Sequence, residues 1–91
     1  MPYIEQRFRD RLDEKINDLA KELMVVSVTG GKAGLMNYTI TRLLHRLYEM
    51  DYPSYDKINS AIGVLECAKQ ELYRKKAAPY EDEKIKENGD V

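Results

Sequence analysis

The stretch VTGGKAGLMNYTITRLLHRLY, Val28 to Tyr48, decides the fold class of this 91-residue chain. Three glycines and a lysine stand directly before a segment whose apolar residues recur at every third or fourth position. Such spacing is typical of an amphipathic helix. The question is whether the glycines form the phosphate-binding loop of a nucleotide hydrolase or a simple bend between two helices.

A phosphate-binding loop needs a glycine, four further residues, then Gly-Lys and a hydroxyl residue that holds Mg²⁺. Here Lys32 follows Gly31, but Ala33 takes the hydroxyl position and Val26 takes the place of the first glycine. The segment before the glycines also has helical rather than strand periodicity. The stretch is therefore predicted to be a flexible connection between helices. Free N–H groups at a helix start, with Lys32 beside them, still attract anions.

Three apolar stripes at helical spacing predict three helices, at about residues 4–26, 35–50 and 55–76. Gly30, Gly31 and Gly34 end the first helix, and Ser54 is the expected N-cap of the third. Pro79 is expected to end the third helix or to begin a new turn. The predicted fold is an all-α, small antiparallel three-helix bundle over residues 1–78. A polar C-terminal tail follows at 79–91, which either forms a short helix from Pro79 to Glu87, with Gly89 beyond its end, or lies extended.

Composition narrows the class of protein further. Hydrophobic residues make up 43% of the chain, charged residues 34%, and the formal net charge is −1. A chain of this size buries a limited core, which favours a homo-oligomer. Near-zero net charge argues against a general nucleic-acid coat. The absence of a long apolar run and of a signal-like N-terminus, together with a single cysteine, predicts a cytoplasmic protein.

The polar face of the second helix is the first candidate site. A solvated face is usually rich in Glu and Lys, whereas this one carries amide, hydroxyl, phenol, guanidinium and imidazole groups that hydrogen-bond and stack. The alternative is an ordinary surface on which tyrosines cover the core. The predicted ligand-binding residues are Lys32, Asn37, Tyr38, Thr41, Arg42 and His45.

The second candidate is the face of the third helix that lies away from its apolar stripe. A glycine inside a helix costs about 1 kcal/mol relative to alanine, which close approach of another backbone would offset. This face is therefore expected to be covered, by another subunit or by the tail; the alternative is an exposed helix. The predicted interface residues are Asn59, Gly63, Glu66, Cys67, Gln70 and Arg74.

Catalytic chemistry finds little support in the residue types. His45 is the only histidine, and no partner acid is evident for it in the sequence. Cys67 lies in the middle of a helix without a paired base. No cluster has metal-ligand spacing. We therefore expect no enzyme activity, no cofactor and no metal.

The segments GLMNYTITRLLHRLY, INSAIGVLECAKQELYR and APYEDEKIKENGDV carry a family likeness. Over about residues 4–91 the chain resembles a family of small, mostly uncharacterised proteins encoded in phages, prophages and bacterial genomes. The resemblance implies a task in host takeover, DNA metabolism or the defeat of host immunity. It implies no particular activity.

Three functions follow from the resemblance and the polar-aromatic face. The first is a non-enzymatic, homo-oligomeric anti-defence protein that sequesters a host cyclic nucleotide signal, because tyrosines stack bases and Arg and Lys bind phosphates. The second is a protein-interaction module that inhibits a host enzyme. The third is a helix-turn-helix-like DNA-binding protein using Arg42, Arg46 and Lys57, against which the net charge argues. No membrane partner is expected.

Overall fold

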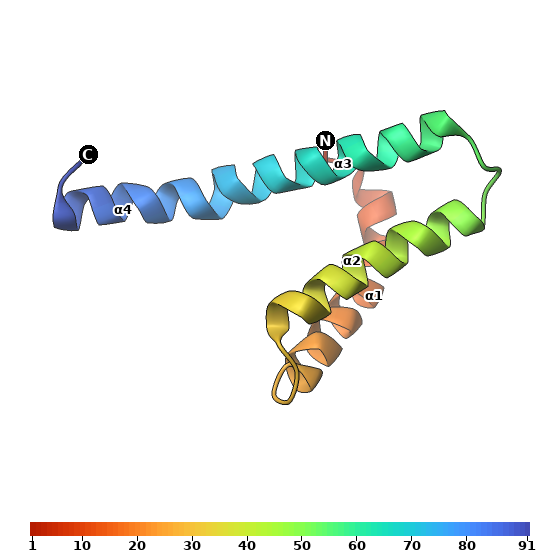
Figure 1. Cartoon of the computed structure of the whole chain (residues 1–91), viewed down its shortest axis with the longest axis horizontal. Helices are drawn as coiled ribbons and strands as arrows, with labels where there is room; N and C mark the ends of the chain where they lie inside the picture. The colour runs from red at the N-terminus through yellow and green to blue at the C-terminus, as the bar shows by residue number, and fades with distance from the viewer.

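All 91 residues are described in a computed structural model, and the chain is helical throughout, with no strand. This confirms the predicted all-α class. The elements in chain order, shown in Figure 1, are α1 (Gln6–Val26), α2 (Lys32–Glu49), α3 (Tyr55–Leu72), the π-helical turn η1 (Tyr73–Ala77) and α4 (Ala78–Asn88).

The glycine connection is shorter than the sequence predicts. Helix α1 ends at Val26, and Gly31 is already the N-cap of α2, with an extended backbone at φ −68° and ψ 120°. Gly34 therefore lies within the first turn of α2 rather than in the loop. Gly30 has a packing role, because a Cβ atom there would lie 3.3 Å from Leu35 Cδ1 and 3.5 Å from the Val26 carbonyl oxygen.

The turn between α2 and α3 is held by polar contacts. Ser54 is the N-cap of α3, as predicted, and its side chain accepts a hydrogen bond from the Lys57 backbone N–H at 3.2 Å. The Lys57 ammonium lies 2.7 Å from Asp51 Oδ1 and donates to the Tyr52 carbonyl oxygen at 2.9 Å. These bonds tie the first turn of α3 back to the loop that precedes it.

Helix α3 ends at Leu72, and Pro79 stands in the first turn of α4, which is the second of the two expectations for this proline. Proline has no N–H, and its ring would clash with the carbonyl of the residue four positions earlier, Lys75, in a regular α-helix. The π-turn η1 removes this conflict by widening the helix just before the proline, and Ala78 N–H bonds the Tyr73 carbonyl five residues back. Helices α3, η1 and α4 therefore form one rod that ends at Gly89, whose φ is +86°.

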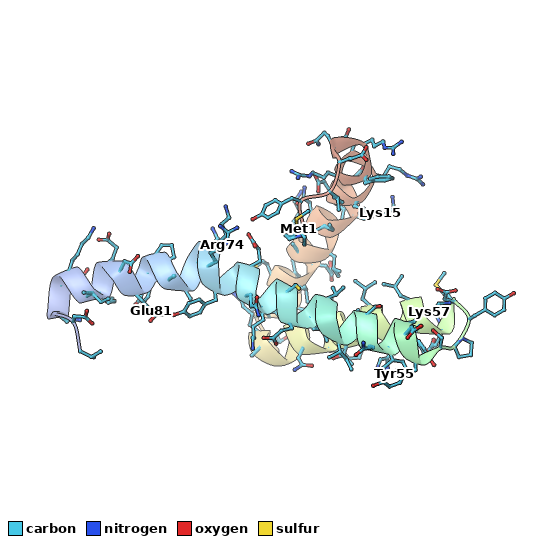
Figure 2. The ribbon with its side chains drawn as sticks, turned by 90° about the horizontal axis from the view of Figure 1, so that it is seen from above. Met1, Lys15, Tyr55, Lys57, Arg74 and Glu81 are labelled. Carbon is cyan, nitrogen blue, oxygen red and sulfur yellow. The ribbon has the colours of Figure 1, made fainter.

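The C-terminal segment does not fold back on its own chain, contrary to one expectation for the tail. Figure 2 shows Arg74 and Glu81 on the same rod, which runs outward from the other helices. The charges of α4 instead pair along the helix, with Lys84–Glu87 at 3.1 Å and Lys86–Glu83 at 3.0 Å. The tail therefore does not cover α3 within the chain.

One chain alone does not close the predicted bundle. Helices α2 and α3 diverge from their connection and α1 crosses behind α2 (Figure 1), so that no residue is fully buried. The radius of gyration is 16.7 Å, against about 12 Å for a compact domain of this length. The accessible surface is 8323 Å², against about 5,500 Å² for a folded monomer of 10.6 kDa.

The apolar stripes are correct as helix faces but remain largely exposed. The contacts of α2 with α1 and with α3 are sparse, so the side chains of the stripes stay between about two-fifths and three-fifths exposed. The affected residues include Phe8, Leu12, Ile16, Met36, Ile40, Leu43, Leu47, Ile58, Ile62, Leu65 and Leu72.

Candidate functional site

A shallow hollow lies on α2 close to its N-terminal end. It is lined by Ala33, Gly34, Asn37, Tyr38 and Thr41. The two small residues at the helix start leave space in front of the polar side chains of the next turns. The Thr41 hydroxyl donates to Asn37 Oδ1 at 3.0 Å, and two-thirds of Tyr38 is exposed. The hollow therefore combines an open phenol ring with amide and hydroxyl groups.

The start of α2 adds positive potential at the same end. No side chain caps it, and no acidic residue stands in its first turn. The first backbone bond of the helix joins Leu35 N–H to the Gly31 carbonyl at 3.0 Å, so the N–H groups of the three preceding residues are free of backbone partners. Free N–H groups, the helix dipole and the Lys32 ammonium together favour an anion here.

The six predicted ligand-binding residues separate into two groups in the structure. Asn37, Tyr38 and Thr41 line the hollow, and Lys32 is the first residue of the same helix. Arg42 instead reaches towards the C-terminal end of α2, where Glu49 Oε1 lies 4.0 Å from its guanidinium.

His45 belongs to a different feature, a groove between α2 and α3 with a volume of about 590 Å³. Polar side chains at and beside the connecting turn join His45 in its lining, namely Tyr48 of α2, Asp51 of the turn and Lys57 of α3. The hydrogen bond from Lys57 lowers the pKa of Asp51, so this carboxylate stays ionised beside the ammonium. The apolar lining comes mainly from Leu44, Leu47, Ile58, Ala61, Ile62, Val64 and Leu65.

The sequence reasoning did not single out this groove as a site. The sequence pattern that indicates it is the pair of apolar stripes on α2 and α3, two helices joined by one short connection. Those stripes were expected to bury each other, and the divergence of the two helices leaves a channel between them instead.

The predicted interface face of α3 is open along its first half. A Cβ atom on Gly63 would meet no other atom within 4 Å, and Asn59 and Cys67 are exposed. Glu66 binds its helix neighbour Lys69 at 2.9 Å, and this bond is the main cause of its lowered pKa. Nothing in the chain itself offsets the cost of a glycine in this helix.

The second half of the same face meets the N-terminus. Met1 and Pro2 line one hollow together with Cys67, Gln70, Glu71 and Arg74, and both figures place the N-terminus beside α3. The covering segment here is the N-terminal one, which the sequence reasoning did not consider because Pro2 and Tyr3 precede the first helical stripe.

Tyr3, Glu71 and Arg74 form the polar centre of this contact. The Tyr3 hydroxyl donates to the Glu71 carboxylate and accepts from Arg74 Nη2 at 2.7 Å, while Arg74 also bonds Glu71 at 2.8 Å. The hydrogen bond to Glu71 raises the pKa of Tyr3, and the same bond, with help from Arg74, lowers the pKa of Glu71. The Arg74 guanidinium therefore already has two hydrogen-bond partners, Tyr3 and Glu71, in its own chain.

The structure has neither a metal-binding cluster nor a helix that could span a membrane. No three His, Cys, Asp or Glu side chains gather in a way that would hold a metal ion. No helix has both the length and the apolar character needed to cross a bilayer.

The fold and these surfaces define a small all-helical protein with one polar-aromatic hollow and wide, unpartnered apolar faces. The chain belongs to the family described as Domain of unknown function (DUF6899), whose model matches residues 1–91. No curated protein and no solved structure matches the chain.

Proposed function

We propose that this protein is a non-enzymatic phage or prophage accessory protein, and that it works as a homo-oligomer in the cytoplasm of the bacterial host. In this proposal it sequesters a cyclic nucleotide signal of host defence. The observation that carries the proposal is the hollow on α2, where Tyr38, Asn37 and Thr41 stand beside an uncapped helix start and Lys32.

The chemistry of the hollow suits a nucleotide. An exposed tyrosine ring stacks on a base, and such stacking contributes about 1–3 kcal/mol per base. Amide and hydroxyl groups bond base edges and ribose, while the free N–H groups of α2 and the Lys32 ammonium neutralise phosphate. None of these groups needs to act as an acid, base or nucleophile, which suits capture rather than turnover.

The exposed surface supports the homo-oligomeric part of the proposal. The chain exposes about 2,800 Å² more than a folded monomer of its mass would. A standard protein interface buries about 800 Å² on each partner, so association with other copies removes this excess only if several faces take part. An oligomer also repeats the α2 hollow once per chain, which raises the number of signal molecules held.

A second candidate function is inhibition of a host enzyme by a protein–protein contact. The observation that favours it is the α2–α3 groove, because an apolar channel of about 590 Å³ with polar groups at one end suits a helix or an extended segment. A stoichiometric host protein that co-purifies through the groove and is lost in Ile62→Asp would support this candidate.

Native mass spectrometry of the protein purified gently from bacterial cells tests the main proposal. The expected result is a discrete oligomer that carries the mass of one nucleotide per site. Cyclic dinucleotides added to the emptied protein should then raise its melting temperature, whereas the linear dinucleotide and the mononucleotide should not. Melting temperatures that no cyclic nucleotide raises would contradict the sequestration function.

A further inference from the structure

Helix α4 has no packing partner in its own chain. It contacts only η1, with which it is continuous, and the rod carries it away from α1 and α2 (Figure 1). Tyr80 is 64% exposed and Ile85 41% exposed, so α4 presents apolar side chains that nothing in the chain covers.

The groove between α2 and α3 also lacks a partner within the chain. It is apolar along its length, and no segment of the chain occupies it. We infer that α4 of one copy lies in the α2–α3 groove of a second copy, and that the second copy returns the same contact. This inference rests on the homo-oligomeric part of the proposed function.

The dimensions of the rod suit such an exchange. Helix α3 has 18 residues, and η1 with α4 has 16. At 1.5 Å per residue both halves are about 25 Å long. Two rods that pair antiparallel about their midpoints, close to Leu72, therefore place each α4 along the α3 helix of the other copy. That α3 helix forms one wall of the groove.

Charge favours the same pairing. Helix α4 carries four carboxylates and two lysines, so its net charge is negative. Helix α2, the other wall of the groove, carries Lys32, Arg42 and Arg46 against the single acid Glu49, so its net charge is positive, and these cations lie outside the apolar lining itself. Opposite net charges on the two helices favour their approach and disfavour a pairing of α4 with a second α4.

The excess of exposed surface also favours the exchange. A reciprocal exchange about a two-fold axis makes α4 and the groove two parts of one self-complementary interface, so that both surfaces of each chain are covered. Two contacts per chain remove a larger part of the excess surface than a single standard interface would. The inference thus accounts for two open surfaces with one arrangement.

Disulfide cross-linking of the full chain tests the placement of α4. Cys67→Ser removes the only native thiol, and Tyr80→Cys with Ile62→Cys then puts one thiol on α4 and one in the groove. The expected product under mild oxidation is a covalent dimer of the double variant. A monomer with an internal disulfide would overturn the inference, because it would mean that α4 folds onto its own groove.

The single-thiol variants supply the controls. Tyr80→Cys alone and Ile62→Cys alone should stay monomeric on a non-reducing gel, because the inferred exchange keeps the two copies of residue 80 apart from each other, and likewise the two copies of residue 62. A covalent dimer from either single variant would overturn the inference and indicate self-pairing of α4 or of the groove.

Sedimentation velocity separates the inference from the proposed function. An oligomer without the cross-link would overturn the exchange while the homo-oligomeric proposal stands, and a monomer at all concentrations would overturn both. In an otherwise unmodified chain, Ile85→Asp should weaken association about tenfold or more, because it places a carboxylate in an apolar contact. Asn88→Asp, which adds the same charge near the helix end, should have little effect; equal effects of the two variants would count against the exchange.

Discussion

Tyr3 and Arg74 lie 71 positions apart in sequence and meet through a hydrogen bond of 2.7 Å between the Arg74 guanidinium and the tyrosine hydroxyl. Glu71 completes the triangle by accepting from both. The contact fastens the extended N-terminal residues to the end of α3. It joins the start of the chain to the junction between α3 and η1.

This link should depend on pH in both directions. The Glu71 pKa is lowered, so its contribution is present above the ordinary glutamate pKa and is lost as the pH falls through the lowered value. The Tyr3 pKa is raised, so its contribution is present below the ordinary tyrosine pKa and is lost as the pH rises through the raised value. Stabilisation by the contact is therefore greatest between mildly acidic and mildly alkaline pH.

Tyr3→Phe tests this window. At neutral pH the variant should show faster amide exchange in residues 3–5 and a lower melting temperature than the parent chain. The difference should shrink below pH 4 and above pH 11. Tyr55→Phe, which alters an exposed hydroxyl on α3, is the matched control. A difference that stays constant across the whole pH range would show that the hydroxyl bond is not its cause.

Ser54→Ala should destabilise the start of α3. The serine side chain accepts from the Lys57 N–H, and loss of such a cap lowers the free energy of unfolding by about 1 kcal/mol. The measurement is chemical denaturation at one fixed protein concentration. Ser60→Ala, which removes a hydroxyl from the interior of the same helix, should cause no comparable loss. Equal effects of the two substitutions would argue against a capping role.

Tyr38→Ala should weaken cyclic nucleotide binding by about 10- to 100-fold, the usual contribution of one stacked base. Tyr38→Phe should keep most of the affinity, because the ring rather than the hydroxyl makes the stack. Isothermal titration calorimetry gives both values. Tyr52→Ala, at an exposed tyrosine in the α2–α3 turn, is the control. Binding that survives Tyr38→Ala unchanged would exclude the α2 hollow as the site.

Gly63→Leu should raise the helical content of the separated chain and weaken the assembly. Leucine favours the helix over glycine by nearly 1 kcal/mol, and the structure shows open space for its side chain within the chain. If another copy covers this face, the larger side chain prevents its approach. Sedimentation should therefore shift to smaller species, whereas Gly34→Leu on α2 should leave it unchanged. An unaltered assembly in Gly63→Leu would mean that this face is exposed to solvent.

Much of the local structure could be predicted from the sequence. Periodic apolar residues identify α1, α2 and α3, and Ser54 marks the start of α3 because its hydroxyl can satisfy an N–H that the helix leaves free. The ends were less certain where two rules compete. Gly34 is a helix breaker by propensity, yet it lies in the first turn of α2, where the N–H groups have no helical partner in any case.

The arrangement of the helices could not be predicted in the same way. An apolar stripe such as Ile58–Ile62–Leu65 indicates that a face is to be covered but not by which chain. The bundle prediction assigned all stripes to one another within a single chain. The site prediction had the same weakness, since Asn37 and His45 lie on one helix but line different recesses.

Pro79 and the wide turn before it have one more consequence. A π-turn accommodates about one residue more than a regular turn, which rotates all that follows by roughly 100° about the helix axis. The side-chain faces of α3 and α4 therefore point in different directions around the helix axis, although the two helices belong to one continuous rod. Pro79→Ala would allow the turn to relax to a regular α-helix. The angle between the faces that α3 and α4 present to other molecules would then change.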